Sequence, residues 1–144
     1  MFKIVVGGII KKDNKYLLIQ EKKEQAYGKW SSPSGRLEPN EDIFVGTKRE
    51  IKEESGLDVE LVGLININNI VDEKNTIVIF NFNTEVIGGE IKIKEDEVLA
   101  VEWFTYEEIN NMKDKLRRPD LLLPTLELLE QGNVKELDNI KIMR

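Results

Sequence analysis

The sequence lacks two of the residue types that most often carry enzyme chemistry. Among its 144 residues there is no cysteine and no histidine. Without cysteine the chain has no disulfide, no thiolate nucleophile and no sulfur ligand, a composition that suits a reducing compartment. Without histidine it has no imidazole to act as base, proton shuttle or metal ligand. Any bound metal must therefore be held by oxygen atoms, which favour magnesium or manganese over zinc or copper.

Positive charge is also in deficit. The chain has 21 Lys plus Arg against 27 Asp plus Glu, a net charge of −6. This balance argues against a long nucleic acid or an anionic membrane as the main partner, but it is compatible with a small polyphosphate that brings its own magnesium. The apolar stretch before Lys11 is too short to span a membrane and has no signal-peptide cleavage site. We expect it to form a buried strand, and we expect a cytoplasmic protein.

The pattern of the chain predicts one domain over residues 1–144. Only four prolines are present, and no linker, repeat or low-complexity tract interrupts the sequence. Periodicity and turn residues predict strands over 3–10, 16–21, 59–70, 76–87, 90–94 and 98–104, and helices over 42–55, 106–115 and 120–131. Asp13-Asn14 is expected to turn the first hairpin. This order favours an α/β fold in which helices cover both faces of a mixed sheet.

Acidic residues are concentrated in residues 35–57, which read GRLEPNEDIFVGTKREIKEESGL. On the predicted helix, Glu50 and Glu54 stand one turn apart on the same face, and Glu53 flanks that face. Carboxylates at this spacing repel one another unless a cation or Arg49 compensates their charge. The cluster therefore has the character of a metal site.

The same charges also fit an ordinary solvated helix surface with a few ion pairs. Two glycines decide between these interpretations. Gly35 precedes the helix in a Pro-Ser-Gly turn, and Gly56 follows it as an expected left-handed C-terminal residue. A helix that is merely solvated does not require glycine at these positions, so we favour the metal site.

This segment resembles the signature of the Nudix hydrolases, G-x5-E-x7-R-E-U-x-E-E-x-G-U, in which U is apolar. All nine specified positions are filled, by Gly35, Glu41, Arg49, Glu50, Ile51, Glu53, Glu54, Gly56 and Leu57. Trp30, Pro33 and the late Glu102-Trp103-Phe104 segment extend the likeness, which covers roughly residues 3–130. It departs at Ser34 and Asn40, where the family usually has glycine. The resemblance implies the Nudix α/β/α sandwich with a mixed sheet.

The resemblance also implies a magnesium site, in which manganese substitutes. Glu50 and Glu54 are expected to be metal ligands, and Glu53 is either a further ligand or the base that deprotonates water. The carbonyl of Ser34 is expected to help coordinate the ion, because Ser34 occupies the place of the first glycine in the family's glycine pair. A backbone ligand survives a change of side chain if the turn is kept.

Other residues of this segment and one later loop have implied roles in catalysis. Arg49 and Glu41 are expected to brace the loop and the helix, and binding of a phosphate is the alternative for Arg49. Glu97 precedes the strand predicted over 98–104, where family members often place an additional ligand or base. Glu95 and Asp96 compete with it, and all three also fit an ordinary charged turn.

Three residues that lead into or lie in the segment are candidates for substrate binding. Arg36 lies immediately beside the turn expected to hold phosphates. Trp30 and Tyr27 flank the approach to it and are candidates to hold a base or sugar. For each of them a plain surface or core position is the alternative.

The implied activity is metal-dependent hydrolysis of a nucleoside diphosphate linked to another group. We favour nucleoside di- or triphosphates, including oxidised ones, as substrates. ADP-ribose is the main alternative, followed by dinucleoside polyphosphates and capped RNA. A module that senses a nucleotide without cleaving it is the alternative of another class, and self-association into a homodimer is left open.

Overall fold

The computed structural model describes residues 1–144. The elements in chain order are β1 (Phe2–Lys12), β2 (Lys15–Glu21), the 3-10 helix η1 (Glu24–Ala26), β3 (Trp30–Ser31), β4 (Ser34–Arg36), α1 (Ile43–Ser55), β5 (Leu57–Val71), β6 (Thr76–Gly89), β7 (Val98–Thr105), α2 (Tyr106–Asn110), the 3-10 helix η2 (Lys113–Lys115) and α3 (Pro119–Glu130).

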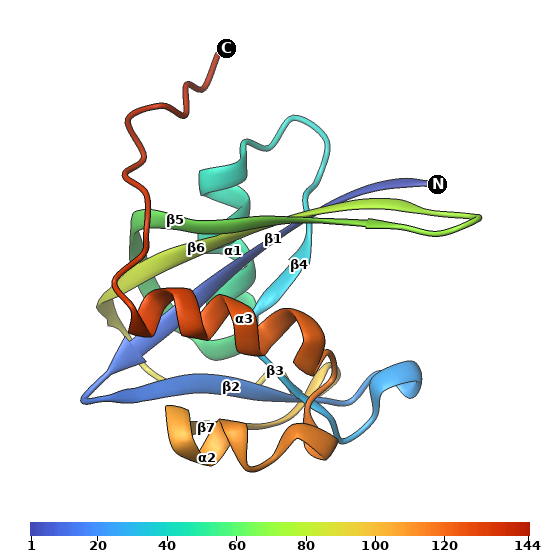
Figure 1. The fold of residues 1–144 in the computed structure, drawn as a ribbon, viewed down its shortest axis with the longest axis vertical. Coiled ribbons are helices and arrows are strands. Elements are labelled where there is room, and N and C mark those ends of the chain that lie inside the picture. The colour runs from blue at the N-terminus through green and yellow to red at the C-terminus, as the bar shows by residue number, and fades with distance from the viewer.

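The seven strands form a mixed sheet. Its strand order is β3-β2-β1-β6-β5, while β4 also pairs with β1 and β7 pairs with β2. The β1–β6 pair is parallel and the other pairs are antiparallel. Helices α1 and α3 cover opposite faces of the sheet, and α2 lies beside β7 (Figure 1). The predicted α/β/α sandwich with a mixed sheet is confirmed.

Alternation along β1 produces the two cores of the sandwich. Ile9 packs in one cluster with Leu122 and Leu126 of α3. Its neighbour Ile10 points to the other face and packs in a second cluster with Ile51 of α1. Because successive side chains of a strand point to opposite faces of the sheet, a continuous run of apolar residues in β1 contributes to the core on each face.

Local signals determine both ends of α1. The side chain of Asp42 accepts hydrogen bonds from the backbone N–H groups of Phe44 and Val45, so it caps the N-terminus. At the other end, Gly56 has a φ of 84° and its N–H donates to the carbonyl of Lys52. The predicted helix and its left-handed glycine are confirmed. None of the helices combines the length and apolar composition that crossing a membrane requires.

The prediction of a strand over residues 90–94 was wrong. Strand β6 continues to Gly89, which pairs with Leu57. The chain then crosses the C-terminal end of α1, where the N–H of Lys92 donates to the carbonyl of Ser55 at 2.8 Å. The segment has the composition of a strand but no neighbouring strand to pair with. The helix predicted over 106–115 is also interrupted, because α2 ends at Asn110 and only the short η2 follows.

Candidate active site

The site is built where β4 meets helix α1. A Cβ atom added at Gly35 would overlap the carboxylate of Glu50. The Glu50 side chain therefore lies directly over the backbone of this loop, in space that only glycine leaves open. This contact explains why the turn before the helix needs a glycine at position 35.

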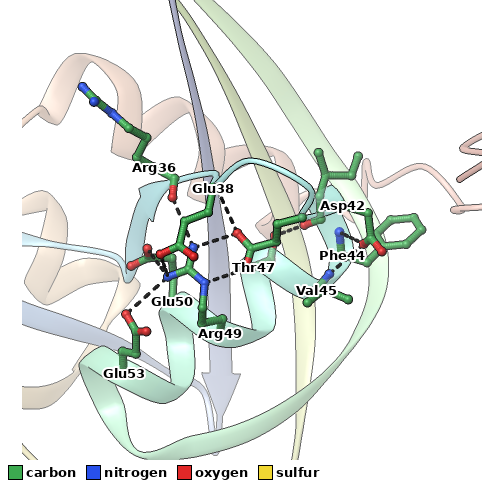
Figure 2. Close-up of polar contacts among 11 residues, drawn as sticks. Arg36, Glu38, Asp42, Phe44, Val45, Thr47, Arg49, Glu50 and Glu53 are labelled. Carbon is green, nitrogen blue, oxygen red and sulfur yellow. Dashed lines mark hydrogen bonds and ion pairs between the residues drawn. The ribbon is translucent and has the colours of Figure 1, made fainter. Parts of the chain in front are cut away.

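Arg49 is the centre of an ion-pair network (Figure 2). Its guanidinium donates to both carboxylate oxygens of Glu41, at 2.6 and 2.8 Å, and to Glu50 at 2.8 Å. A longer bond of 3.3 Å reaches Glu53. The hydrogen bond from Arg49 lowers the pKa of Glu41, and the bond to Glu41 is the main cause that raises the pKa of Arg49. Arg49 and Glu41 are thus placed to brace the loop against the helix.

Glu54 is the most deeply buried carboxylate of the helix, with 3% of its surface exposed. Its Oε1 accepts a 2.8 Å hydrogen bond from the backbone N–H of Ser34. Burial raises the pKa of Glu54 to about 8, and the charges of Glu50 and Glu21 add to this effect while the Ser34 bond opposes it. A carboxylate in this position would be stabilised as an anion by a nearby cation.

The oxygen donors of the site are of the chemical type that a hard divalent ion prefers. Burial also raises the pKa of Glu50, although Arg49 acts against this shift. Glu54 is buried and Glu50 partly buried, one helical turn apart, and both are disfavoured as anions, so the pair is suited to neutralisation by a cation. As the side chains stand, no three acidic residues lie close enough together to hold one ion. The carbonyl of Ser34 remains a predicted metal ligand. The hydrogen bond from the backbone N–H of Ser34 to Glu54 was not predicted from the sequence.

The two candidate bases lie nearer the surface. Glu53 has 40% of its side chain exposed, and its contact within the site is with Arg49. Glu97 immediately precedes β7 and forms a 3.3 Å ion pair with Lys94. The pKa of Lys94 is raised first by the hydrogen bond to Glu97 and also, to a smaller extent, by the charge of Glu53. The role of either residue as base stays a prediction.

Glu21 is a residue of this site that sequence reasoning missed. It is only 4% exposed, although two exposed lysines, Lys22 and Lys23, follow it in the chain. Its Oε1 accepts from Arg117 at 3.1 Å and from Ser31 at 3.3 Å, whereas its Oε2 has no hydrogen-bond partner. The local sequence does not indicate that Glu21 is buried, because its burial depends on the position of β2 in the sheet.

A cavity of about 520 Å³ borders the site at Ser34 and Gly35. Apolar side chains of β1, β5 and β6 line it, together with two amides: Val5, Ile9, Ile70, Ile77, Ile79, Asn68 and Asn81. Trp30 and Arg36 also line the cavity, and their role in substrate binding stays a prediction. Trp30 packs edge-on against Phe104, with ring centroids 5.0 Å apart. Tyr27 is 64% exposed and does not line this cavity, so its role stays a prediction.

The chain is similar in sequence to curated proteins from several organisms. The chain is 34% identical over 111 residues to putative nudix hydrolase 1 of Caenorhabditis elegans. This alignment covers 76% of this chain and 30% of that protein. It is 36% identical over 111 residues to the ADP-ribose pyrophosphatase of Methanocaldococcus jannaschii, covering 76% and 63%. It is 34% identical over 105 residues to the 8-oxo-dGDP phosphatase NUDT18 of Danio rerio, covering 69% and 31%. The chain thus spans less than two thirds of each relative.

A solved structure and a family model both match this chain over most of its length. A NUDIX hydrolase from Nitrosomonas europaea superposes with a TM-score of 0.89 at 26% identity, covering 99% of this chain and 98% of that one. The family model described as NUDIX domain matches residues 1–124. The match includes the complete segment 35–57, in which Glu50 and Glu54 meet the Ser34–Gly35 loop. The chain belongs to the Nudix family.

Proposed function

We propose that this protein is a metal-dependent pyrophosphohydrolase that cleaves a nucleoside diphosphate linked to another group. The observation that carries this proposal is the position of Glu54. It is a buried carboxylate one turn from Glu50, bonded to the backbone of Ser34, and Ser34 lines a cavity of about 520 Å³. Such a pair of carboxylates beside a nucleotide-sized cavity suits phosphoryl chemistry with a hard divalent ion.

Each residue of the site has a distinct task in this mechanism. Glu50 and Glu54 would hold the ion, which when bound supplies neutralisation of phosphate charge and activation of water. Glu53 is exposed on the same helix and is our candidate to accept the proton from that water, with Glu97 as the alternative. Arg49 and Glu41 hold the loop against the helix through the bonds described above, which keeps the carboxylates in place.

For the substrate we favour a nucleoside di- or triphosphate, including an oxidised one. The relative from Danio rerio named as an 8-oxo-dGDP phosphatase supports this preference. The apolar lining and the Trp30 ring of the cavity suit the face of a base. ADP-ribose is the second candidate, supported by the relative from Methanocaldococcus jannaschii. Because the fold alone does not determine a substrate, the choice depends on the cavity.

The direct test is turnover of a nucleotide panel with products separated by chromatography. We expect hydrolysis with magnesium and with manganese, and loss of activity in excess chelator that is restored by added metal. Full turnover in chelator would rule out the metal mechanism. Tight nucleotide binding without any turnover would instead identify a sensing module. We also propose a cytoplasmic location, since a chain without cysteine suits a reducing compartment.

A further inference from the structure

The cavity beside the active site is strongly cationic, although the protein as a whole is acidic. Five basic residues line it, and no aspartate or glutamate is among the lining residues. These five are Lys3, Lys23, Arg36, Arg117 and Arg118. The whole chain carries a net charge of −6. The cavity therefore carries a local excess of positive charge, beside the loop that contacts Glu50 and Glu54 of α1.

Three of these cations have no ion-pair partner. Lys3, Lys23 and Arg36 take part in no salt bridge of the structure. Figure 2 shows the guanidinium of Arg36 directed away from Arg49 and the glutamates that surround it. A surface that served only solubility would interleave charges of both signs. This group instead leaves its positive charge available to a ligand.

The cations also lie close enough to repel one another. The pKa of Lys3 is lowered first by burial and then by the charges of Arg36, Arg117 and Lys23. These cations come from four separate segments: β1, β4, the segment after β2 and the segment before α3. Their charges repel one another around the same cavity. Such like-charge repulsion is relieved when an anion binds among them.

Arg117 is held in place from two sides. Its backbone N–H donates to the carbonyl of Trp30 at 2.9 Å, and its side chain donates to the buried Glu21 at 3.1 Å. A guanidinium has five N–H donors, and this ion pair leaves others free. Its side chain is 45% exposed and lines the cavity. Glu21 therefore positions Arg117 to meet an anionic ligand there.

We propose that Lys3, Lys23, Arg36 and Arg117 form a site for an additional phosphate of the substrate, beyond the diphosphate that is cleaved. This inference rests on the proposed function and deepens it. The additional phosphate is either a third phosphate of a linear chain or a phosphomonoester on the sugar. A substrate whose second moiety is uncharged, such as ADP-ribose, leaves the site without its anion and is the poorer substrate.

A binding experiment tests the site without relying on hydrolysis. Calorimetry measures the affinity of inorganic tripolyphosphate for the full chain, with no divalent ion added. Loss of one charged contact in Lys3→Gln is expected to weaken binding about tenfold, and Lys3→Arg restores it. Lys12→Gln is the matched control, because Lys12 is an exposed residue at the other end of the same strand. Equal affinity of Lys3→Gln and Lys12→Gln would overturn the proposal.

Two matched substrate pairs identify the source of the phosphate. ATP is compared with ADP, and ADP-ribose with its 2′-phosphorylated form, in the wild type and in Lys3→Gln. In the wild type we expect kcat/KM to be higher for the more phosphorylated member of at least one pair, and Lys3→Gln to reduce that preference about tenfold. A change confined to the first pair assigns the site to the phosphate chain, and one confined to the second assigns it to a sugar phosphate. No preference in either pair would overturn the proposal.

The two proposals can fail separately. Binding of tripolyphosphate that depends on Lys3, with no hydrolysis of any nucleotide, would refute the enzymatic function and support the anion site. Hydrolysis that is indifferent to the additional phosphate and to Lys3 would support the enzymatic function and refute the site.

Discussion

The backbone N–H of Ser34 donates a 2.8 Å hydrogen bond to Oε1 of Glu54. The bond joins the start of β4 to the last turn of α1, two segments that the chain separates by 20 residues. It is made by the backbone, so the serine side chain is not needed for it. The loop that borders the cavity and the carboxylate proposed to hold the metal ion are therefore fixed relative to each other.

We predict that Ser34→Gly keeps most of the activity and that Ser34→Pro does not. Glycine retains the N–H that bonds Glu54 and the carbonyl proposed as a ligand, whereas proline removes the N–H and restricts Pro33 before it. A hydrogen bond to a charged group is worth about 1.5–3 kcal/mol, so turnover of the proline variant should fall at least about tenfold. Steady-state kinetics of both variants checks this. A large loss in the glycine variant would show that the hydroxyl matters.

Glu53→Gln and Glu54→Gln should each lower turnover by about 100-fold or more while the fold is kept. The first change removes a candidate base, and the second removes the charge of a proposed metal ligand. Glu73→Gln is the control, since Glu73 lies in the exposed turn between β5 and β6. Turnover is measured at saturating magnesium, with circular dichroism to verify the fold. Near-wild-type rates in both variants would refute the assignment of this helix as catalytic.

Stability of the metal-free protein should decrease as the pH rises from about 4.5 to about 8. The ordinary pKa of the carboxyl is 4.5, and burial raises that of Glu54 to about 8 in the folded state. Between these values Glu54 keeps its proton in the folded protein but loses it in the unfolded chain. The contribution of Glu54 to the free energy of unfolding is therefore complete below pH 4.5 and is lost as the pH passes 8. One pKa unit corresponds to about 1.4 kcal/mol.

Thermal denaturation between pH 5 and pH 8.5 in chelator measures this decrease. In Glu54→Gln the melting temperature should depend less on pH than in the wild type. Added magnesium should raise the stability of the wild type most near pH 8.5. Glu53→Gln is the control, because Glu53 is partly exposed and should leave the slope in place. A wild-type curve with the same slope as that of Glu54→Gln would contradict the prediction.

Glu97→Gln should lower turnover more than Glu95→Gln. Glu97 immediately precedes β7, and its partner Lys94 is influenced by the charge of Glu53. The effect should be milder than that of Glu54→Gln, because Glu50 and Glu54 remain. If Glu97 is the base, its loss should also remove one limb of the pH–rate profile. Equal small losses with unchanged profiles would leave Glu53 as the candidate base.

Gly35→Ala should reduce activity strongly, whereas Gly132→Ala should not. A methyl group at Gly35 would overlap the carboxylate of Glu50, so Glu50 would have to leave its position over the loop. At Gly132, after α3, a methyl group meets no atom within 4 Å, although its φ of 69° makes alanine mildly strained. Kinetics at several magnesium concentrations should show a weaker apparent magnesium affinity for Gly35→Ala only. An unchanged affinity would indicate that Glu50 does not hold the ion.

The elements whose signals are local could be predicted from the sequence. Helix α1 was predictable because its cap, its periodicity and its left-handed Gly56 all lie within one short segment. The spacing of Glu50 and Glu54 then places them on one face of any helix that forms there. The absence of cysteine and histidine likewise restricts the chemistry to oxygen ligands, whatever the fold.

The surroundings of these carboxylates depend on tertiary packing and could not be predicted from the sequence. Glu21 and Arg117 are 96 residues apart in the chain and meet because β2, β3 and the segment before α3 converge. The cationic cavity depends on the same convergence, since its residues come from distant elements of the sheet and from α3. Residues 90–94 have the composition of a strand but form none, because β pairing requires a neighbour that local sequence does not specify. Burial and charge environment are properties of that packing, and they give Glu54 a raised pKa and leave Lys3 among other cations.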